Sequence, residues 1–352
     1  MTTPYLSVVM PAYDCALLLD RALAAIAASD LPRADWEVIV ADDGSRDATS
    51  DVAARQADRV VHVADGPRGP GHARNLGASV ARGELLVFVD ADVCVSSTAL
   101  AQFAALFRAD SALGAAFGAY DSTPEAPGLV SQYRNLIHHY VHTTNAGPSN
   151  TFWAGCGAVR RAAFDAVGGF DVARYPRPQI EDIELGYRLA AAGYPILLRP
   201  EIQGRHLKRW TLRGGFVTDV RDRGVPWMRL LLERREVAAA GPLNLRRREK
   251  AFTLLVPLAS ALLLAAVVRR STTLLLAGAL AVLVVVAGNG ALLAWFARMR
   301  GWRFALGVVP LRLAYYLLNA VSAGWVLLGG PSRRAGAAMS SRDTFQNAGT
   351  PT

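Results

Sequence analysis

Residues Leu85 to Asp92 read LLVFVDAD and give the clearest indication of the fold. Five consecutive apolar residues of this kind are typical of a strand that is buried on both faces of a parallel sheet. Similar runs alternate with helical patterns on either side of it. The expected strands are 6–10, 36–41 and 59–64, and the expected helices are about 15–28, 47–57, 72–82 and 97–108. The alternation predicts an α/β fold with a mostly parallel, Rossmann-like sheet covered by helices on both faces.

The composition separates the chain into two parts with different charge. With 52% hydrophobic residues the chain is not disordered, and its three cysteines lack the spacing of a zinc site or a disulfide framework. Up to residue 205 there are 17 Lys and Arg against 23 Asp and Glu, and after it 21 against 6. The later basic residues lie beside long apolar runs, so membrane lipids rather than nucleic acid are the expected partner.

The carboxy-terminal third has the composition of a membrane region. Its apolar runs are 251–268, 271–297 and 304–330. Each is near or above the roughly 20 residues that a helix needs to cross the hydrocarbon, so about three transmembrane helices are expected in residues 251–330. Basic residues before the first run and between the second and third place those loops in the cytoplasm, although Arg269, Arg270, Arg333 and Arg334 oppose this topology. Arg312 within the third run must face protein or extend to the interface.

We expect four regions along the chain. Residues 1–212 form the α/β domain, 213–250 an amphipathic interfacial segment or linker, 251–330 the transmembrane region and 331–352 a flexible tail. Within the linker, residues 225–237 have the mixed apolar and basic faces of a helix lying in the membrane interface. An ordinary amphipathic surface helix would show the same pattern. The expected location is a multi-pass protein of the cell inner membrane, with the first domain in the cytoplasm.

Acidic residues follow three of the expected strands. Ligands of open parallel sheets bind outside the carboxyl ends of the strands, and those ends carry Asp14, Asp42–Ser45 and the pair Asp90 and Asp92. Carboxylates gathered at one edge need a cation, and Mg²⁺ or Mn²⁺ that also binds a diphosphate fits oxygen ligands of this kind. A structural interpretation stays open, in which Asp42–Ser45 is an Asx turn, Asp47 or Ser45 caps the next helix, and Asp14 is a helix cap.

Two helix starts add charged groups. Arg74 begins a helix whose amide end can approach phosphate, unless it is a solvated surface arginine. The sequence EDIEL, Glu181 to Leu185, opens another helix. Acidic residues in a first turn stabilise the helix dipole by about 0.3–1 kcal/mol, but three are more than a cap requires. A carboxylate there, beside an electrophilic sugar, can take a proton from an acceptor hydroxyl.

The glycine-rich residues 66–71 lack the third glycine of a dinucleotide-binding loop, which argues against an oxidoreductase.

The order of PAYD, ADDGS, DAD, WAGCGAVRR and EDIEL resembles the family 2 glycosyltransferases of the GT-A fold over about 210 residues. The resemblance implies an inverting, metal-dependent transfer of a sugar from a UDP- or GDP-sugar to a hydroxyl on a glycan, lipid-linked or small-molecule acceptor, with Mg²⁺ or Mn²⁺ as cofactor. It implies that the nucleotide is bound by Ala12, Tyr13, Asp43, Arg74 and Asp90, and that the metal is bound by Asp92 and also Asp90. It implies that Asp182 is the catalytic base. The donor-sugar and acceptor pocket would be lined by Trp153, Gly155, Cys156, Gly157 and Glu181. A turn packed by small residues is the alternative for residues 153–157.

Residues 206–210, HLKRW, are similar to the Q-x-x-R-W motif of processive members of that family. The resemblance implies that Arg209 meets the diphosphate and that Trp210 stacks on the acceptor. His206 stands in place of the glutamine, which argues against processivity and leaves it as a metal ligand or a diphosphate contact. A membrane-facing basic stretch is the alternative. His138, His139 and His142 lie on an expected helix, either as a metal site or on a surface or acceptor-facing side.

Three functions remain open, two of them sugar transfers and one from another class. The first is a membrane-anchored transferase acting on a hydroxyl. The second transfers a sugar to a polyprenyl phosphate, which is already ionised and needs no protein base. The third is a catalytically silent membrane scaffold that binds nucleotide or lipid. A transporter rests only on Arg312 and the apolar runs.

Overall fold

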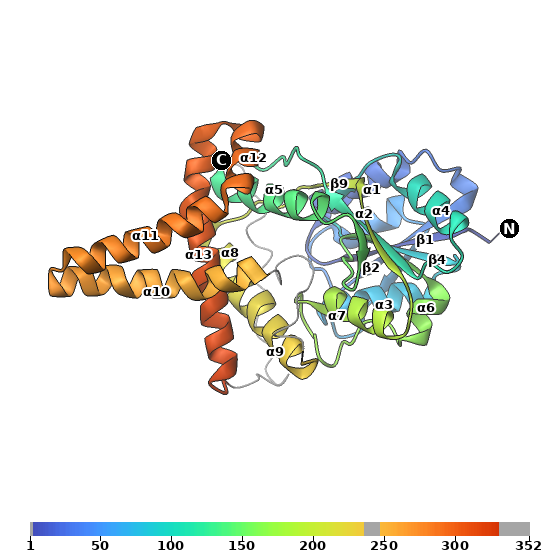
Figure 1. Cartoon of the computed structure of the whole chain (residues 1–352). Helices are drawn as coiled ribbons and strands as arrows, with labels where there is room; N and C mark the ends of the chain where they lie inside the picture. Colours follow the sequence, from blue (N-terminus) through green and yellow to red (C-terminus); the bar gives the residue numbers. More distant parts are fainter. Residues whose placement is uncertain (1–2, 236–246, 331–352) are drawn as a thin grey trace. The chain divides into compact units, whose positions relative to one another are not determined.

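The computed structural model describes residues 3–235 and 247–330 (Figure 1). These residues form two compact units. The first comprises 3–127 and 134–209, and the second comprises 128–133, 210–235 and 247–330. The division after Arg209 lies three residues before the expected boundary. The expected tail and part of the expected linker lie outside the described residues.

The first unit alternates strands and helices. Its strands are β1 (Leu6–Ala12), β2 (Trp36–Asp42), β3 (Arg59–His62), β4 (Leu85–Val89), β5 (Val93–Val95), β6 (Ala115–Tyr120), β7 (Gly147–Ser149), β8 (Cys156–Arg160) and β9 (Ile196–His206). Its helices are α1 (Ala16–Ala27), η1 (Arg33–Asp35), α2 (Thr49–Gln56), α3 (Pro70–Val80), α4 (Ala99–Ala109), most of α5 (Leu129–Thr143), α6 (Arg161–Ala166) and α7 (Glu181–Ala191). All four strands and all four helices expected between residues 6 and 108 are present.

The strands form one mixed sheet in the order β3-β2-β1-β4-β8-β6-β9-β5, with β7 paired to β9. The first four strands are parallel, as expected from their continuous apolar runs. Beyond β4 the sheet is mixed, because β8 is antiparallel to both β4 and β6, and β9 is parallel to β6 but antiparallel to β5 and β7. The α/β class is therefore confirmed, and the parallel arrangement holds for the amino-terminal half of the sheet.

Alternate residues of the central strands fill two separate cores. Val8 on β1 packs on one face of the sheet in a cluster with Leu23 of α1 and Phe103 of α4. Phe88 on β4 packs on the other face, with Phe164 of α6 in its cluster. Helices cover both faces, as the ribbon in Figure 1 shows. This burial on both sides explains why β4 is apolar at every position and why the one polar side chain of β1, Ser7, is bonded to Glu37.

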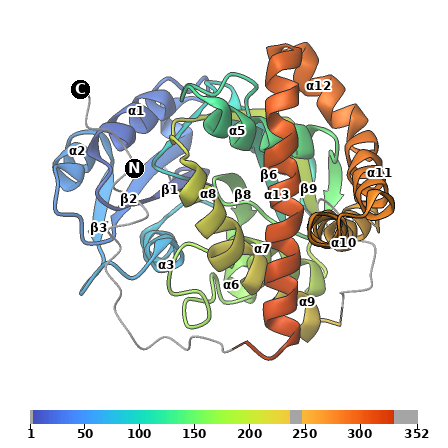
Figure 2. The same cartoon turned by 90° about the vertical axis from the view of Figure 1, so that its left-hand side faces the viewer.

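The second unit is helical. Its elements are α8 (Leu212–Val217), the π-helix η2 (Thr218–Gly224), α9 (Val225–Glu233), α10 (Arg247–Arg269), α11 (Thr272–Gly288), α12 (Gly290–Arg300) and α13 (Trp302–Leu327). Among the described residues, α10 and α13 are each long and apolar enough to cross a membrane. The apolar run 271–297, expected as one span, is broken instead. Its helices α11 and α12 meet at a 61° bend, and together they count as a third span or as a re-entrant pair (Figure 2).

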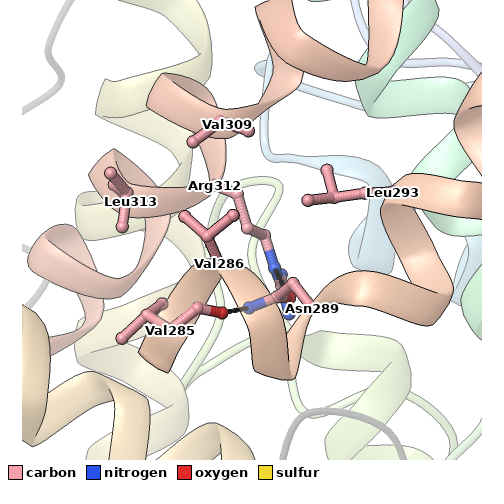
Figure 3. Close-up of a pocket in the computed structure, with 7 residues that line it drawn as sticks. All are labelled: Val285, Val286, Asn289, Leu293, Val309, Arg312 and Leu313. Atoms are coloured by element: carbon pink, nitrogen blue, oxygen red, sulfur yellow. Dashed lines mark hydrogen bonds between the residues drawn. The ribbon is translucent and has the colours of Figure 1, made fainter. Parts of the chain in front are cut away.

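A buried polar cluster lies at the break between α11 and α12. Arg312 of α13 is only 8% exposed, and its Nε donates to Oδ1 of Asn289 at 3.1 Å. Its Nη2 donates to Oε2 of Glu249, which also accepts from the Tyr316 hydroxyl at 3.0 Å. Figure 3 shows Arg312 directed at Asn289 past the apolar side chain of Val286. The expectation that Arg312 faces protein is thus confirmed, since Glu249 supplies the opposite charge.

Candidate active site

The loops that follow β1 and β2 are joined by their own side chains. Oδ1 of Asp42 accepts from the amide of Ser45 at 3.0 Å, and Oδ1 of Asp47 accepts from the amide of Thr49 at the start of α2 at 2.9 Å. The Ser45 hydroxyl accepts from the amide of Asp14 at 3.0 Å. The Asx-type turn at Asp42 is therefore confirmed. The expected caps are wrong, because Ala48 is the N-cap of α2 and has no side-chain cap bond, and Asp14 accepts from the amide of Arg46 and does not cap α1. The turn brings the ends of the two strands together at one edge of the sheet.

Asp43 fastens a third loop to this edge. Its two carboxylate oxygens accept from the amides of Arg68 and Gly69, each at 2.7 Å, and its own amide donates to the carbonyl of Ala12. Burial raises the pKa of the Asp43 carboxyl, against the opposing effect of these amides. Ala12 is buried at the end of β1 and Tyr13 is half-buried after it. A nucleotide-binding role for the three residues stays a prediction, and the loop contact is what the structure adds.

Arg74 is the central cation of the site. It is 4% exposed, so the alternative of a solvated surface arginine is wrong. Its Nη2 donates to Oδ1 of Asp90 at 2.6 Å, and its Nη1 donates to Oε1 of Glu181 at 3.0 Å. Burial alone would lower the pKa of this guanidinium, but the two carboxylates outweigh burial and raise it. One side chain from α3 thus joins the end of β4 to the start of α7.

The turn at residues 153–157 makes a second connection between the same two motifs. The carbonyl of Gly155 accepts from the amide of Asp90 at 3.2 Å, and the amide of Ala154 donates to Oδ2 of Asp182 at 3.1 Å. A Cβ added to Gly155 would lie 2.5 Å from the indole ring of Trp153. The small residues are therefore required by packing. The turn holds the DAD and EDIEL segments at a fixed separation.

Cys156 and Gly157 continue this turn into β8. Cys156 is fully buried opposite Val89, and burial raises the pKa of its thiol to about 12, so it stays a thiol near neutral pH. A Cβ on Gly157 would lie 2.4 Å from the carbonyl oxygen of Trp153. Both residues serve the packing of the turn, and their expected place in the acceptor pocket stays a prediction.

The three acids of EDIEL have different partners. Glu184 forms an ion pair with Arg188 one turn later, at 2.8 Å, and Glu181 pairs with Arg74. The contacts of the Asp182 carboxylate are with two backbone amides, those of Ala154 and Ile183. Burial, together with the negative charge of Glu181, raises the pKa of Asp182 to about 6. Of the three, Asp182 is therefore the carboxylate suited to accept a proton near neutral pH.

Asp92 faces His206 at the neighbouring strand ends. Nε2 of His206 lies 3.2 Å from Oδ2 of Asp92, and its Nδ1 lies 2.6 Å from Oδ1 of Asn135. Burial alone would raise the pKa of the Asp92 carboxyl, but His206 and the more distant charge of Lys208 outweigh it and lower the pKa to about 2. The sequence motifs contain both Asp92 and His206, but the contact between them is not predicted by either motif.

The facing pair is chemically suited to a divalent cation. A carboxylate oxygen and an imidazole nitrogen point at one another, and the second imidazole nitrogen is held by an amide, as in metal sites with a fixed histidine tautomer. Within residues 3–235 and 247–330, no three or more His, Cys, Asp or Glu side chains are grouped to hold a metal ion. A cation at this pair would therefore take its remaining ligands from the substrate diphosphate and water, as Mg²⁺ and Mn²⁺ commonly do.

Comparison with known proteins gives the family of this domain. A family model described as glycosyl transferase family 2 matches residues 7–168. This part of the chain is a family 2 glycosyltransferase domain. The match ends before Asp182 and His206, so it includes the edge with Asp43, Arg74 and Asp92 but not the proposed base.

Individual relatives and a solved structure agree with the glycosyltransferase family. Two proteins named validoxylamine A glucosyltransferase, from Streptomyces hygroscopicus subspecies jinggangensis and limoneus, are each 34% identical over 233 residues, which is 57% of this chain. The chain spans about half of their length, 55% and 51%. The mannosyltransferase PcManGT of Pyrobaculum calidifontis, solved with GDP-Man and Mn²⁺, aligns over 93% of this chain and 88% of its own, with a TM-score of 0.59 at 21% identity. At that identity the likeness concerns the fold, which is GT-A.

The histidines of α5 in the glycosyltransferase domain are hydrogen-bonding groups of the core. Nδ1 of His139 lies 2.7 Å from the carbonyl of Tyr120, and Nδ1 of His142 lies 2.9 Å from the carbonyl of Gly118. Burial lowers the pKa of His142 to about 4, so its imidazole is neutral. His138 packs against the ring of Tyr120. The metal-site alternative for this helix is not supported, because the rings contact carbonyls and aromatic side chains at the end of β6.

The HLKRW segment is divided between the two units. His206 contacts Asp92, and Arg209 is exposed at the end of the first unit. Trp210 belongs to the second unit, where its amide donates to the hydroxyl of Ser131 at 2.8 Å. The assigned roles of Arg209 and Trp210 stay predictions. Tyr120 and Asn135 contact His206 but carry no sequence signal, since they lie in an ordinary strand and an ordinary helix.

Proposed function

We propose that this chain is a membrane-anchored, inverting glycosyltransferase that transfers a sugar from a nucleotide diphosphate sugar to a hydroxyl acceptor. The observation that carries the proposal is the pair of connections between Asp90 and the start of α7, one through Arg74 and one through the turn at Gly155 and Ala154. These connections hold a carboxylate with a raised pKa near the strand end that carries Asp92. The relatives named for glucosyl transfer support a sugar donor.

Asp182 is the proposed catalytic base. The acceptor oxygen forms a bond to the anomeric carbon, and the bond from that carbon to the diphosphate breaks, with its electron pair leaving on the diphosphate. Asp182 takes the proton that the acceptor hydroxyl loses. Attack from the face opposite the leaving group inverts the configuration, and no covalent enzyme intermediate is needed.

Asp92 and His206 are the residues proposed to hold Mg²⁺ or Mn²⁺, with Asp90 directed to the ribose. When bound there, the cation would neutralise charge on the leaving diphosphate. Arg74 is already engaged by two carboxylates, so we assign it to holding Asp90 and Glu181 in place. Arg209, which is exposed three residues beyond His206, is the proposed diphosphate contact in the same domain.

A hydroxyl acceptor is favoured over a polyprenyl phosphate by the state of Asp182. An ionised phosphate acceptor would need no base, and a negative carboxylate beside it would repel it. The carboxylate of Asp182 is hydrogen-bonded by the amides of Ala154 and Ile183, and its pKa is raised, as a general base requires. Trp153, next to the amide that contacts Asp182, is the proposed wall of the acceptor pocket.

Membrane anchoring is proposed from the second unit. Helices α10 and α13 have the length and hydropathy of spans, and large apolar side chains such as Leu254, Leu264 and Val268 are more than two-thirds exposed. We place the protein in the inner membrane with the glycosyltransferase domain in the cytoplasm. Extraction of membranes with alkaline carbonate should leave the chain in the pellet, and release into the supernatant would contradict the anchoring.

The experiment that tests the function is a screen of UDP- and GDP-sugars with the purified full chain. A true donor should raise the unfolding temperature in the presence of Mn²⁺ or Mg²⁺, because ligand binding stabilises the folded state. The same donor should be hydrolysed slowly without an acceptor. Asp92→Ala should lose the hydrolysis, whereas Asp20→Ala, which alters a surface aspartate of α1 bonded to Gln56, should keep it. Stabilisation without any turnover would instead support a silent scaffold.

A further inference from the structure

The imidazole of His206 is held on three sides. Its Nδ1 lies 2.6 Å from Oδ1 of Asn135, and its Nε2 lies 3.2 Å from Oδ2 of Asp92. An amide oxygen can only accept a hydrogen bond, so Nδ1 carries a proton. In the neutral imidazole the lone pair is then on Nε2, on the side of Asp92.

Tyr120 fixes the plane of the same ring. The phenol ring of Tyr120 lies parallel to the His206 imidazole, with an interplanar angle of 5° and centroids 4.4 Å apart. Tyr120 is itself held by His138, whose ring centroid lies 4.2 Å away, and by Trp153, which meets it edge-on at 4.8 Å. Tilting of the imidazole would therefore require the whole aromatic group to move.

The backbone explains why these side chains meet. In the sheet, Tyr120 pairs with Gly204, two residues before His206, and His206 pairs with Val93, next to Asp92. Tyr120 and His206 therefore come from adjacent strands, β6 and β9. Helix α5 is fastened to β6 through His139, which contacts the carbonyl of Tyr120. Asn135 lies one helical turn before His139 on the same face of α5.

We propose that Asn135 and Tyr120 are positioning residues that present Nε2 of His206 to the divalent cation of the transferase. Asn135 selects the tautomer, and Tyr120 fixes the ring orientation. The inference rests on the proposed function, because it assigns a purpose to residues around the proposed metal pair. The inference goes beyond the proposed function by naming two residues that touch neither the cation nor the substrate.

The test is the affinity of the full chain for Mn²⁺, followed from the electron paramagnetic resonance signal of the free ion with UDP or GDP present. Loss of an outer partner of a metal-bound histidine typically weakens metal affinity about 10–100-fold. Asn135→Leu, which removes the acceptor, and Tyr120→Leu, which removes the ring, should each show this loss. Asn135→Asp keeps an acceptor and Tyr120→Phe keeps the ring, so both should bind Mn²⁺ nearly as the unaltered chain does.

Asn145→Leu is the matched control. Asn145 follows the end of α5, and its side chain bonds back to the carbonyl of Val141. Its replacement should leave Mn²⁺ affinity unchanged. If His206→Ala abolishes Mn²⁺ binding while Asn135→Leu and Tyr120→Leu bind normally, the inference is overturned and the proposed function stands. If the unaltered chain binds no Mn²⁺ in the presence of either nucleotide, the metal-dependent part of the proposed function fails and this inference fails with it.

A second measurement needs no variant that could misfold at Asn135. The ¹⁵N spectrum of the metal-free chain, with the His206 signals identified by their loss in His206→Gln, reports which ring nitrogen carries the proton. At a pH where the imidazole is neutral, the inference predicts protonated Nδ1. Protonated Nε2 would overturn it, whatever the variants show.

Discussion

The Nη2 atom of Arg74 lies 2.6 Å from Oδ1 of Asp90. The other terminal nitrogen of the same guanidinium bonds Glu181, the residue before the proposed base. Two acidic segments 91 residues apart are thereby joined by one buried cation. Without it, two carboxylates would face each other with no charge between them. Arg74 is thus a condition for bringing the strand end and the start of α7 together.

Replacement of Arg74 should destabilise the domain strongly. Arg74→Met leaves Asp90 and Glu181 without their cation, and breaking a buried ion pair in this way costs about 3–5 kcal/mol of unfolding free energy. Arg74→Lys should also be destabilising, since a single ammonium cannot reproduce the forked contact. The double variant Arg74→Met with Glu181→Gln should recover part of the loss. Thermal unfolding of the purified chain measures these differences, and equal stability of all four proteins would refute the role given to Arg74.

The pH dependence of turnover should report the pKa of Asp182. Burial and Glu181 raise that pKa to about 6, and the base acts only when ionised. At saturating substrates the rate should therefore be level above about pH 7 and fall about tenfold per unit below pH 6. Glu184→Gln, which alters an acid paired with Arg188, should keep this profile in the folded fraction. A rate that stays level down to about pH 4.5 would show that no group with this pKa must be ionised.

The sequence predicted the parallel half of the sheet because continuous apolar runs such as Leu85–Val89 leave little choice of structure. It also predicted that acidic residues gather at the strand ends. It did not predict β6, β8 and β9 as partners, because short strands such as Ala115–Tyr120 contain glycine and alanine and lack a strong pattern. Their mixed directions depend on pairing between segments far apart in the chain.

Only those residues of the site that stand in sequence motifs were predicted. Asp182 and Asp92 stand in recognisable patterns, whereas the contact of His206 with Asn135 depends on the packing of α5 against β6 and β9. Arg74 was expected to meet phosphate, and its burial between two carboxylates could not be read from spacing. The break at Asn289 was also hidden, because hydropathy does not register one polar residue within a long apolar run.

The metal site should prefer Mn²⁺ to Mg²⁺. Mg²⁺ favours oxygen ligands, whereas an imidazole nitrogen is better accepted by transition metals. His206→Asp, which replaces the nitrogen ligand by oxygen, should therefore reduce the ratio of Mn²⁺ to Mg²⁺ affinity. Competition between the two ions, measured in the presence of the nucleotide, gives this ratio directly. An unchanged ratio would mean that His206 is not a ligand.

The buried cluster of the second unit should behave as a charge pair. Arg312→Leu removes the buried cation that pairs with Glu249, and about 3–5 kcal/mol of stability should be lost. The double variant Arg312→Leu with Glu249→Leu removes both charges from an apolar setting and should regain most of that loss. Denaturant unfolding in detergent distinguishes the two cases. A double variant less stable than Arg312→Leu alone would argue against the pairing.

Asp182→Asn tests the proposed role of Asp182 as the catalytic base with two readouts. The side chain keeps its shape and an acceptor for the Ala154 amide, so the domain should fold. The folded-state pKa of Asp182 lies above its unfolded value, so the stability that it contributes is full below that unfolded value and is lost as the pH rises through about 6. Near neutral pH the ionised Asp182 carboxylate therefore lowers the free energy of unfolding by about 1–3 kcal/mol. Asp182→Asn removes this charge, so the variant should unfold at a higher temperature than the unaltered chain.

The most direct measurement is the turnover number of Asp182→Asn with a donor that both proteins bind equally well. If Asp182 removes the acceptor proton, turnover should fall by about 10²–10⁴-fold while the dissociation constant of the nucleotide sugar stays unchanged. Turnover close to that of the unaltered chain would contradict the account and would favour an acceptor, such as a lipid phosphate, that arrives already ionised.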